Sequence, residues 1–331
     1  MNKNLVLLSV LICFVAAVFL WSDIYLAPEP GSNKLVSFTV EKGEGAKEIS
    51  VKLKSEGLLK HSSIFRIYVL LIGKSKKLQA GQYELSPSMS LSDIVKKFSK
   101  GKIIKEKITI IEGWNLKDIA RYFQEKNISS QEEFLELTKN DFSQGISVLS
   151  DKPKDLDLEG YLFPDTYEII PGTSAKNIIK KILNNLDQKI TPDLREEISR
   201  QKKSIFEIIT MASLIEKEVS SFEDKKIVSG IFWKRIKTNT PLQSCASINY
   251  ITGKNDRGAL WQDIEIDSPY NTYKYRGLPL GPISNPGLES ILASIYPEES
   301  DYWYYLSTPS GKTIFSKTFK EHSAAQDKYL K

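Results

Sequence analysis

The chain has 331 residues and a net charge of +5, with 46 Lys and Arg residues against 41 Asp and Glu, and 41% of its residues are hydrophobic. This composition predicts a globular protein of about two domains and excludes an intrinsically disordered chain. The small, dispersed positive excess is typical of a solvated lysine-rich surface. It gives no strong case for nucleic acid, although it allows a weak attraction to an anionic polymer.

The first predicted element is the uninterrupted apolar run LVLLSVLICFVAAVFLW, residues 5–21. Its length suits a short membrane span and exceeds most signal-peptide cores. Lys3 precedes the run and acidic residues follow it, so the positive-inside rule predicts a cytoplasmic tip, residues 1–4, and an extracytoplasmic body, residues 22–331. No clean A-x-A cleavage site follows. We therefore expect a single-pass anchor in the cell inner (cytoplasmic) membrane, with a cleaved signal as the alternative.

A small α+β unit is predicted at residues 35–101, after a linker at residues 22–34 that is rich in Pro, Gly and Ser. Alternating and amphipathic patterns predict its elements in the order strand, helix, helix, strand, helix. A serine opens the last helix as a cap, and Gly101 ends it.

A larger region of mixed helices and strands is predicted at residues 102–331, which makes the fold class α+β overall. The segments TVEKGEGAKEIS and TIIEGWNLKDIA share a strand–turn–helix pattern, a weak internal similarity. Further helices are expected over the ranges 174–190, 204–218, 223–237, 288–296 and 319–331, and a hairpin over 301–316.

The sequence gives little support for a metal-binding or nucleotide-binding site. Cys13 lies in the apolar run, far from Cys245, so a disulfide between them is implausible, and His61 and His322 are the only histidines. The chain has no CxxC, HExxH, Walker or G-x-G-x-x-G motif. We therefore expect no cofactor and no metal, and chemistry that rests on carboxylates.

The helix at residues 204–218 ends in the unusual sequence MASLIEKE. On a helical wheel counted from Ile205, Glu216 falls at about 20°, inside the apolar face, and Glu218 at about 220°, on its flank. A buried carboxyl has a raised pKa, and a carboxylic acid held protonated near neutral pH is what glycosidic-bond cleavage needs as its general acid. The structural alternative is a helix that ends near Val219, with both glutamates in water.

Two further segments combine acids, aromatics and turns. EGYLFPDTYEI supplies Glu159 and Asp165 among aromatic side chains that suit sugar rings, or else forms a tight turn over a core. The segment DSPYNTYKYRGLPLGPISNPG is too long and too rich in Pro and Gly for a simple connector. It fits the wall of a groove for an extended polymer, with a structural meander as the alternative.

Taken in order, these segments resemble the YceG-like family of membrane-anchored endolytic murein transglycosylases. The resemblance covers nearly the whole chain and rests on the anchor and on AGQYEL, EGW, LEGYLFPDTY, MASLIEKE, FWKRI, PLQS, YNTYKYRGLPLGPISNPG and FSKTFKEHSAAQ. It implies a LysM-like domain at 35–101 and a catalytic domain at 102–331.

The implied activity is that of a lyase of cell-wall biogenesis. Such a lytic transglycosylase cleaves the MurNAc–GlcNAc β-1,4 bond within nascent peptidoglycan strands, leaves 1,6-anhydroMurNAc ends and terminates elongation. The implied partners are peptidoglycan strands, the inner membrane and peptidoglycan synthases, without nucleic acid.

The resemblance also assigns site residues. It places the catalytic carboxyl at Glu218, whereas the wheel favours Glu216, which we rank second. The residues expected to bind substrate are Glu159, Asp165, Gln243, Tyr270, Asn271, Thr272, Tyr273 and Asn285, with Gly281 and Pro286 shaping the cleft.

One segment departs from the family pattern. Where the family usually has Thr-Asp-Pro, this chain has Ser244, Cys245 and Ala246, which puts any role of that Asp in doubt. The alternatives are a hydrolytic muramidase, for which Asp165 or Glu159 could supply the second carboxylate, and a non-catalytic peptidoglycan-binding scaffold.

Overall fold

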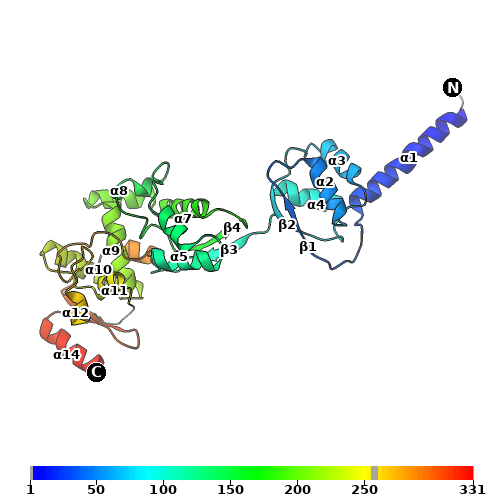
Figure 1. Cartoon of the computed structure of the whole chain (residues 1–331). Coiled ribbons are helices and arrows are strands. Elements are labelled where there is room, and N and C mark those ends of the chain that lie inside the picture. The colour runs from blue at the N-terminus through cyan, green and yellow to red at the C-terminus, as the bar shows by residue number, and fades with distance from the viewer. Residues whose placement is uncertain (1–2, 255–259, 331) are drawn as a thin grey trace. The chain divides into compact units, whose positions relative to one another are not determined.

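The computed structural model describes residues 3–254 and 260–330, with the side chains of residues 3–5 excepted (Figure 1). The chain divides into two compact units, which we call unit 1 (Met1–Lys107 with Glu168–Gly172) and unit 2 (Ile108–Tyr167 with Thr173–Lys331). Both units combine helices with short strands, which confirms the predicted α+β class. Residues 1 and 2 of the predicted cytoplasmic tip lie outside the described residues.

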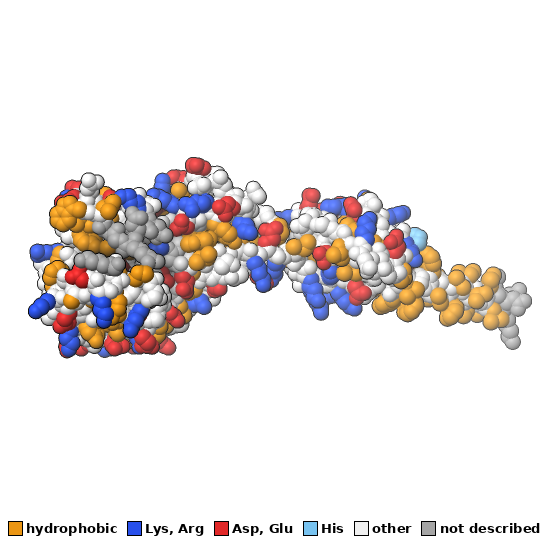
Figure 2. Space-filling model, turned by 90° about the horizontal axis from the view of Figure 1, so that it is seen from below, with side chains coloured by type: hydrophobic (Ala, Val, Ile, Leu, Met, Phe, Trp, Pro, Cys, Tyr) orange, Lys and Arg blue, Asp and Glu red, His pale blue; other side chains and the backbone are white. Residues whose placement is uncertain are grey.

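Unit 1 begins with α1 (Lys3–Tyr25), a long apolar helix that extends away from the rest of the unit over most of its length (Figure 2). Its segment Val6–Tyr25 has a mean hydropathy of 2.4 and is long enough to cross a membrane. The apolar run therefore forms the single helix that was predicted, and the helix continues to Tyr25. It is compatible with a single-pass membrane anchor.

The body of unit 1 packs three helices against a small antiparallel sheet. Strands β1 (Val36–Val40) and β2 (Gly81–Leu85) pair with Val36 opposite Leu85, and β1 alternates buried and exposed residues as its sequence predicts. The helices are α2 (Ala46–Ser55), α3 (Ser62–Leu71) and α4 (Leu91–Lys100). Their apolar faces share one core with the sheet, so this segment buries its own hydrophobic surface.

Helix α4 shows how local sequence sets the ends of an element. The Ser90 side chain accepts a hydrogen bond from the backbone N–H of Asp93, which satisfies one of the free donors of the first turn. Gly101 ends the helix in the left-handed conformation, with φ 63°, that glycine adopts at little cost. Both the serine cap and the glycine stop are as predicted.

The next part of the chain combines one sheet with several helices. Strands β3 (Glu106–Thr109) and β4 (Thr166–Ile169) pair with each other. The helical elements are α5 (Leu116–Glu125), α6 (Gln131–Leu137), the 3-10 turn η1 (Ser147–Leu149), α7 (Ala175–Lys189) and α8 (Pro192–Arg200). Both segments that were predicted to share a strand–turn–helix pattern form it, as β1 followed by α2 and as β3 followed by α5.

The remainder of unit 2 is organised around α9 (Ile205–Glu218), which packs against α10 (Phe222–Lys237) and α13 (Leu288–Ile295). Helices α11 (Cys245–Thr252) and α12 (Trp261–Ile264) lie between them in sequence. Strands β5 (Tyr304–Ser307) and β6 (Thr313–Ser316) form the predicted antiparallel hairpin, and α14 (Phe319–Tyr329) follows. Apolar side chains of α9, α10 and the 278–283 segment form a shared core.

Candidate active site

Helix α9 carries two carboxylates in its last turn, directly after a run of buried residues. Ser204 and Glu207 form a capping box at its start, and the buried side chains run from Ile205 to Ile215. The helix ends at Glu218 because Val219 is extended, with φ −144° and ψ 154°. The negative end of the helix dipole disfavours carboxylates there, so each must be stabilised by specific partners.

The Glu216 carboxylate joins three helices. It accepts hydrogen bonds from the Gly287 backbone N–H at 3.0 Å and the Ser290 hydroxyl at 2.6 Å, both at the start of α13. The Lys225 ammonium of α10 lies at 3.5 Å, and only 8% of the Glu216 and 4% of the Lys225 side chain is exposed. The position of Glu216 inside the apolar face, as the wheel predicts, therefore matches a buried carboxylate whose oxygens are engaged between helices.

A further acid lies beside this network. Burial raises the pKa of Glu112, and the negative charge of Glu216 raises it further. A Cβ atom on Gly287 would come within 2.1 Å of a Glu112 carboxylate oxygen. Glycine at this position therefore lets the chain pass close to both acids at the start of α13.

Glu218 has a different environment, built from a loop and a strand. Its half-buried carboxylate accepts hydrogen bonds from the Ser244 hydroxyl, the Tyr305 hydroxyl of β5 and the Ala246 backbone N–H. Burial raises the pKa of Glu218 above its usual value, although these three donors and the nearby Arg235 charge act in the opposite direction. The result is a carboxyl that favours the protonated form and has a fixed orientation.

The positive charge of Arg235 in α10 lowers the pKa of Glu218. Its guanidinium, 6% exposed, donates to the backbone oxygens of Leu242 at 2.7 Å and Trp303 at 2.6 Å, and lies over the Tyr304 ring. Burial lowers the pKa of Arg235. Because the guanidinium is held by neutral groups, its charge is free to stabilise a carboxylate that forms on Glu218.

Thr272 positions the serine that contacts Glu218. The Ser244 backbone N–H donates to the Thr272 hydroxyl at 3.0 Å, and the Gln243 N–H donates to the Thr272 carbonyl at 3.0 Å. Gln243 adopts φ 53°, an uncommon conformation for a residue other than glycine. The turn at 243–244 is thus braced by the loop that the sequence identified, and the Gln243 side chain is exposed.

The thiol of Cys245 lies in the same cluster. Its Sγ is 3.0 Å from the Tyr273 hydroxyl. Burial, the neighbouring thiol and the charge of Glu218 all raise the pKa of Tyr273. Cys245 therefore faces a half-buried tyrosine one residue from the Ser244–Glu218 hydrogen bond.

Two predicted substrate-binding residues lie together in the interior. Glu159 accepts from the Leu116 backbone N–H at 3.0 Å and from the Asn285 amide at 3.3 Å. Asn285 also accepts from the Leu162 N–H at 2.7 Å and donates to the Trp114 carbonyl at 2.9 Å. Burial raises the pKa of Glu159 to about 8. The pair ties the start of α5 to two distant segments.

Asn271 and Asp165 are two further predicted substrate-binding residues, and they lie in different environments. The buried Asn271 amide donates to the carbonyls of Ile264 and Ile266, each at 2.8 Å, and its oxygen accepts from the Tyr273 N–H at 3.0 Å. It therefore organises the loop from within. Asp165 is exposed and accepts from the Asn185 amide at 3.0 Å, and no hydrogen bond that we observe among the described residues links it to the Glu218 cluster.

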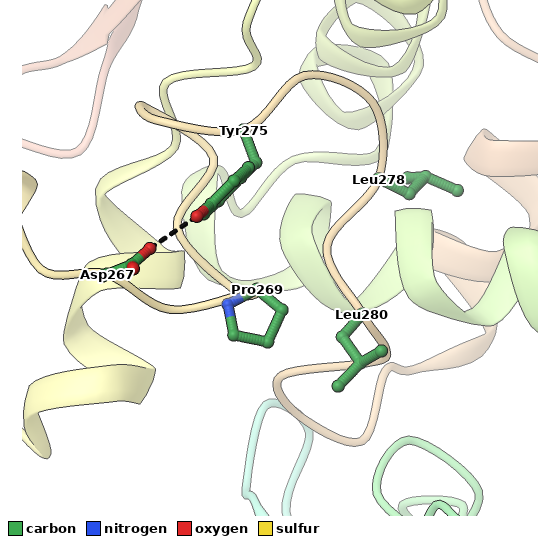
Figure 3. A pocket seen from close by; sticks show the side chains of 5 residues that line it. All are labelled: Asp267, Pro269, Tyr275, Leu278 and Leu280. Atoms are coloured by element: carbon green, nitrogen blue, oxygen red, sulfur yellow. Dashed lines mark hydrogen bonds between the residues drawn. The ribbon is translucent and has the colours of Figure 1, made fainter.

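An open cavity of about 590 Å³ lies along the same loop (Figure 3). Its lining residues are Asp267, Pro269, Tyr275, Leu278 and Leu280. The Tyr275 hydroxyl donates to Asp267, as the dashed line shows, and Leu278 packs against the core around α9. The half-buried Tyr270 contacts Tyr250, with the two tilted rings 5.1 Å apart between their centroids. The loop thus presents a hollow with apolar and aromatic walls.

Sequence reasoning missed three groups around Glu218: Ser244, Tyr305 and Arg235. Ser244 was noted only as a departure from the family pattern, and Arg235 only within the FWKRI motif. Tyr305 was part of a strand prediction, and no local signal separated it from its aromatic neighbours.

Among the described residues, no group of three or more His, Cys, Asp or Glu side chains could hold a metal ion.

Comparison with known proteins gives a consistent result. The model of the YceG-like family matches residues 38–328. An endolytic murein transglycosylase of Bacillus subtilis (strain 168) is 34% identical over 329 residues, which cover 96% of this chain and 91% of that protein. Another, of Streptococcus pneumoniae serotype 2, is 32% identical over 91% of this chain and 59% of its own length. A solved YceG-like protein structure from Listeria monocytogenes matches 89% of this chain and all of that chain, with a TM-score of 0.61 and 35% identity.

Proposed function

Because the chain belongs to the YceG-like family, we propose that it is an endolytic lytic transglycosylase of peptidoglycan. It would cleave the MurNAc–GlcNAc β-1,4 bond within nascent strands and so end their elongation. The observation that carries this proposal is the Glu218 carboxyl, which ends a buried helix, is oriented by Ser244 and Tyr305, and has its pKa raised by burial. The relatives named endolytic murein transglycosylase support it.

In the proposed reaction, one carboxyl serves as acid and then as base. Protonated Glu218 donates its proton to the glycosidic oxygen, which leaves as the C4 hydroxyl of GlcNAc. The C6 hydroxyl of the same MurNAc attacks C1 and forms the 1,6-anhydro ring, and its proton passes to the Glu218 carboxylate. Water is not consumed and Glu218 is regenerated, so no second nucleophilic carboxylate is needed, in contrast to most glycosidases.

The neighbours of Glu218 suit these two roles. Burial raises the pKa of Glu218 and so favours the protonated form, which must act as an acid in the first step. The hydroxyls of Ser244 and Tyr305 and the charge of Arg235 favour the carboxylate that exists for part of the cycle. Glu216 has no free carboxylate oxygen in its network with Gly287, Ser290 and Lys225, and we assign it a supporting role.

The predicted substrate-binding residues fall into two groups in this proposal. Those with side chains that reach the surface would contact the glycan: Asp165, Gln243, Tyr270 and Tyr273. The buried residues would shape the cleft through the contacts described above: Glu159, Asn271, Thr272 and Asn285. Aromatic side chains on this loop suit the faces of sugar rings, and Gln243 supplies a polar group next to Ser244.

The location of the enzyme follows from α1. We propose that Val6–Tyr25 anchors the chain in the cytoplasmic membrane, with the N-terminus inside and the rest of the chain on the extracytoplasmic side, where peptidoglycan is assembled. Peptidoglycan synthases at the same membrane are the proposed protein partners. The LysM-like character of residues 35–101 remains a prediction that would add a second glycan-binding element.

The test is the chemical identity of the product ends. The full-length protein in detergent is incubated with isolated glycan strands, and the fragments are analysed by mass spectrometry. We expect 1,6-anhydroMurNAc ends, and none of them with Glu218→Gln. Reducing MurNAc ends would identify a hydrolytic muramidase instead. Binding of strands without any cleavage, unaffected by Glu218→Gln, would identify a scaffold.

A further inference from the structure

Helix α3 is apolar on two faces, although only one of them packs inside unit 1. Its inner side chains, Ile64, Phe65 and Val69, are buried in the core. On its outer side, 71% of Leu70 and 77% of Leu71 is exposed. The outer face also includes Ile67 and the following Ile72, both exposed. A contiguous apolar face of this kind marks an interaction surface rather than ordinary solvent exposure.

The start of α3 is fixed to the end of the apolar helix α1. The His61 ring nitrogen Nδ1, just before α3, lies 2.6 Å from a carboxylate oxygen of Asp23 in α1. The His61 ring also contacts the Phe19 ring at 5.5 Å, and Ile24 packs against the core of unit 1. The apolar face of α3 therefore begins where the candidate membrane span ends.

Basic residues flank this face. Arg66 is exposed on α3, and three lysines follow the helix within a few residues: Lys74, Lys76 and Lys77. Lys76 and Lys77 are exposed, and Figure 2 shows several lysine and arginine side chains on the surface of unit 1. An exposed apolar stripe with basic neighbours is typical of a helix that lies in a membrane interface and contacts anionic headgroups.

We propose that α3 is a second membrane contact, which lies in the surface of the bilayer that α1 crosses. Ile67, Leu70, Leu71 and Ile72 enter the boundary between headgroups and acyl chains, and the lysines contact anionic phospholipid headgroups. Lysine and arginine stems can extend along apolar surface while their charges stay in water, so both contacts can form together. This proposal rests on the proposed anchor role of α1. The contact holds unit 1 against the membrane.

The apolar face of α3 is assigned to the bilayer because α3 is joined to the candidate membrane span α1. A bilayer is the medium that surrounds α1, and His61 joins α3 to α1 directly. A protein partner or a second copy of the chain would also cover an apolar face, and these are separate outcomes of the test. Trp21 and Tyr25 are exposed near the end of α1, with their ring centroids 5.9 Å apart. Tryptophan and tyrosine are enriched at the level of the headgroups in membrane proteins.

The test uses the full-length chain in nanodiscs of phosphatidylcholine and phosphatidylglycerol in equal amounts. An environment-sensitive NBD fluorophore is attached in Cys13→Ser, Cys245→Ser protein at Leu71→Cys, or in the matched control at Thr39→Cys, an exposed position in β1. In Figure 1, β1 and α3 lie on different sides of the unit. We expect a blue-shifted emission and quenching by acyl-chain nitroxide lipids at position 71, and water-like emission at position 39.

A third label separates failure of this proposal from failure of the anchor. The native Cys13, exposed on α1, reports insertion of the span in protein that carries only Cys245→Ser. Quenching at Cys13 without quenching at position 71 would overturn the α3 contact alone. A blue shift at 71 without lipid quenching would indicate protein cover and also overturn it. No quenching at either position would overturn both the anchor and the contact.

The lysines give an independent measurement. With the label at position 71, Lys76→Glu together with Lys77→Glu should reduce the quenching, as should nanodiscs made of phosphatidylcholine alone. Quenching at Cys13 should be unchanged in both cases, because insertion of α1 does not depend on these charges. Equal quenching at 71 in all conditions would overturn the headgroup part of the proposal.

Discussion

Glu216 and Glu218 stand two residues apart on one helix, yet the structure places them in environments of different kinds. Glu216 is engaged by a lysine, a hydroxyl and a backbone amide that belong to two other helices. Glu218 is engaged by two hydroxyls and a backbone amide, and burial dominates its pKa. Glu216 is thus held in an ion pair between helices, whereas Glu218 is held by neutral donors that leave its carboxyl able to exchange a proton.

The prediction with the largest effect concerns activity, which should depend on Glu218 much more than on Glu216. Glu218→Gln keeps the size of the side chain but cannot transfer a proton, so we expect cleavage of glycan strands to fall by at least about 100-fold. The rate is followed by release of fragments, and circular dichroism checks that the fold is intact. Glu216→Gln is the matched control and should keep most of the activity. A Glu218→Gln protein with normal activity would remove Glu218 from the mechanism.

The second expected effect separates them by stability. Glu216→Ala leaves the buried Lys225 without its closest partner, and we expect a loss of about 3 kcal/mol in the free energy of unfolding. Thermal unfolding followed by circular dichroism measures it as a lower midpoint. Glu216→Ala together with Lys225→Met should recover part of this loss, because the unpaired charge is gone. An unchanged midpoint for Glu216→Ala would contradict the structural role.

Glu159 extends the comparison to a carboxyl with no cation among its hydrogen-bond donors. Its pKa of about 8 in the folded protein exceeds the usual 4.5. At pH values between these two, the folded state therefore binds more protons than the unfolded state. As the pH rises through this range, the free energy of unfolding falls by about 1.4 kcal/mol per pH unit, and the stabilising contribution of Glu159 is lost above about pH 8. Between pH 5 and pH 7.5, the free energy of unfolding should decrease less for Glu159→Gln than for the unchanged protein. Equal decreases would show that Glu159 does not titrate in this range.

The smallest effect concerns the tuning of Glu218. The Tyr305 hydroxyl favours the Glu218 carboxylate, so Tyr305→Phe should raise the pKa of Glu218 further. The protonated acid then persists to higher pH, and the alkaline limb of the kcat/KM profile moves upward in pH. Ser307→Ala is the control, because Ser307 donates to the Glu218 backbone oxygen at 3.1 Å and does not contact the carboxylate. An alkaline limb that does not move would contradict the assignment.

Much of the fold could be predicted from local sequence. The apolar run, the serine cap and glycine stop of α4, the hairpin of β5 and β6 and the burial of Glu216 follow from periodicity and capping, which depend on residues within one or two turns. The exposed side of α3 could not be predicted in this way. Its inner and outer faces are both apolar, so periodicity does not show which one packs.

Helix periodicity fixes which side chains share a face, so the position of two carboxylates at the end of a buried helix follows from the amino-acid sequence alone. What surrounds each carboxylate depends on the tertiary fold. Ser244 and Ser307 reach Glu218 across 26 and 89 positions, and Asn285 reaches Glu159 across 126. Contacts over such separations depend on how the elements pack, and packing is set by the whole core rather than by any one segment.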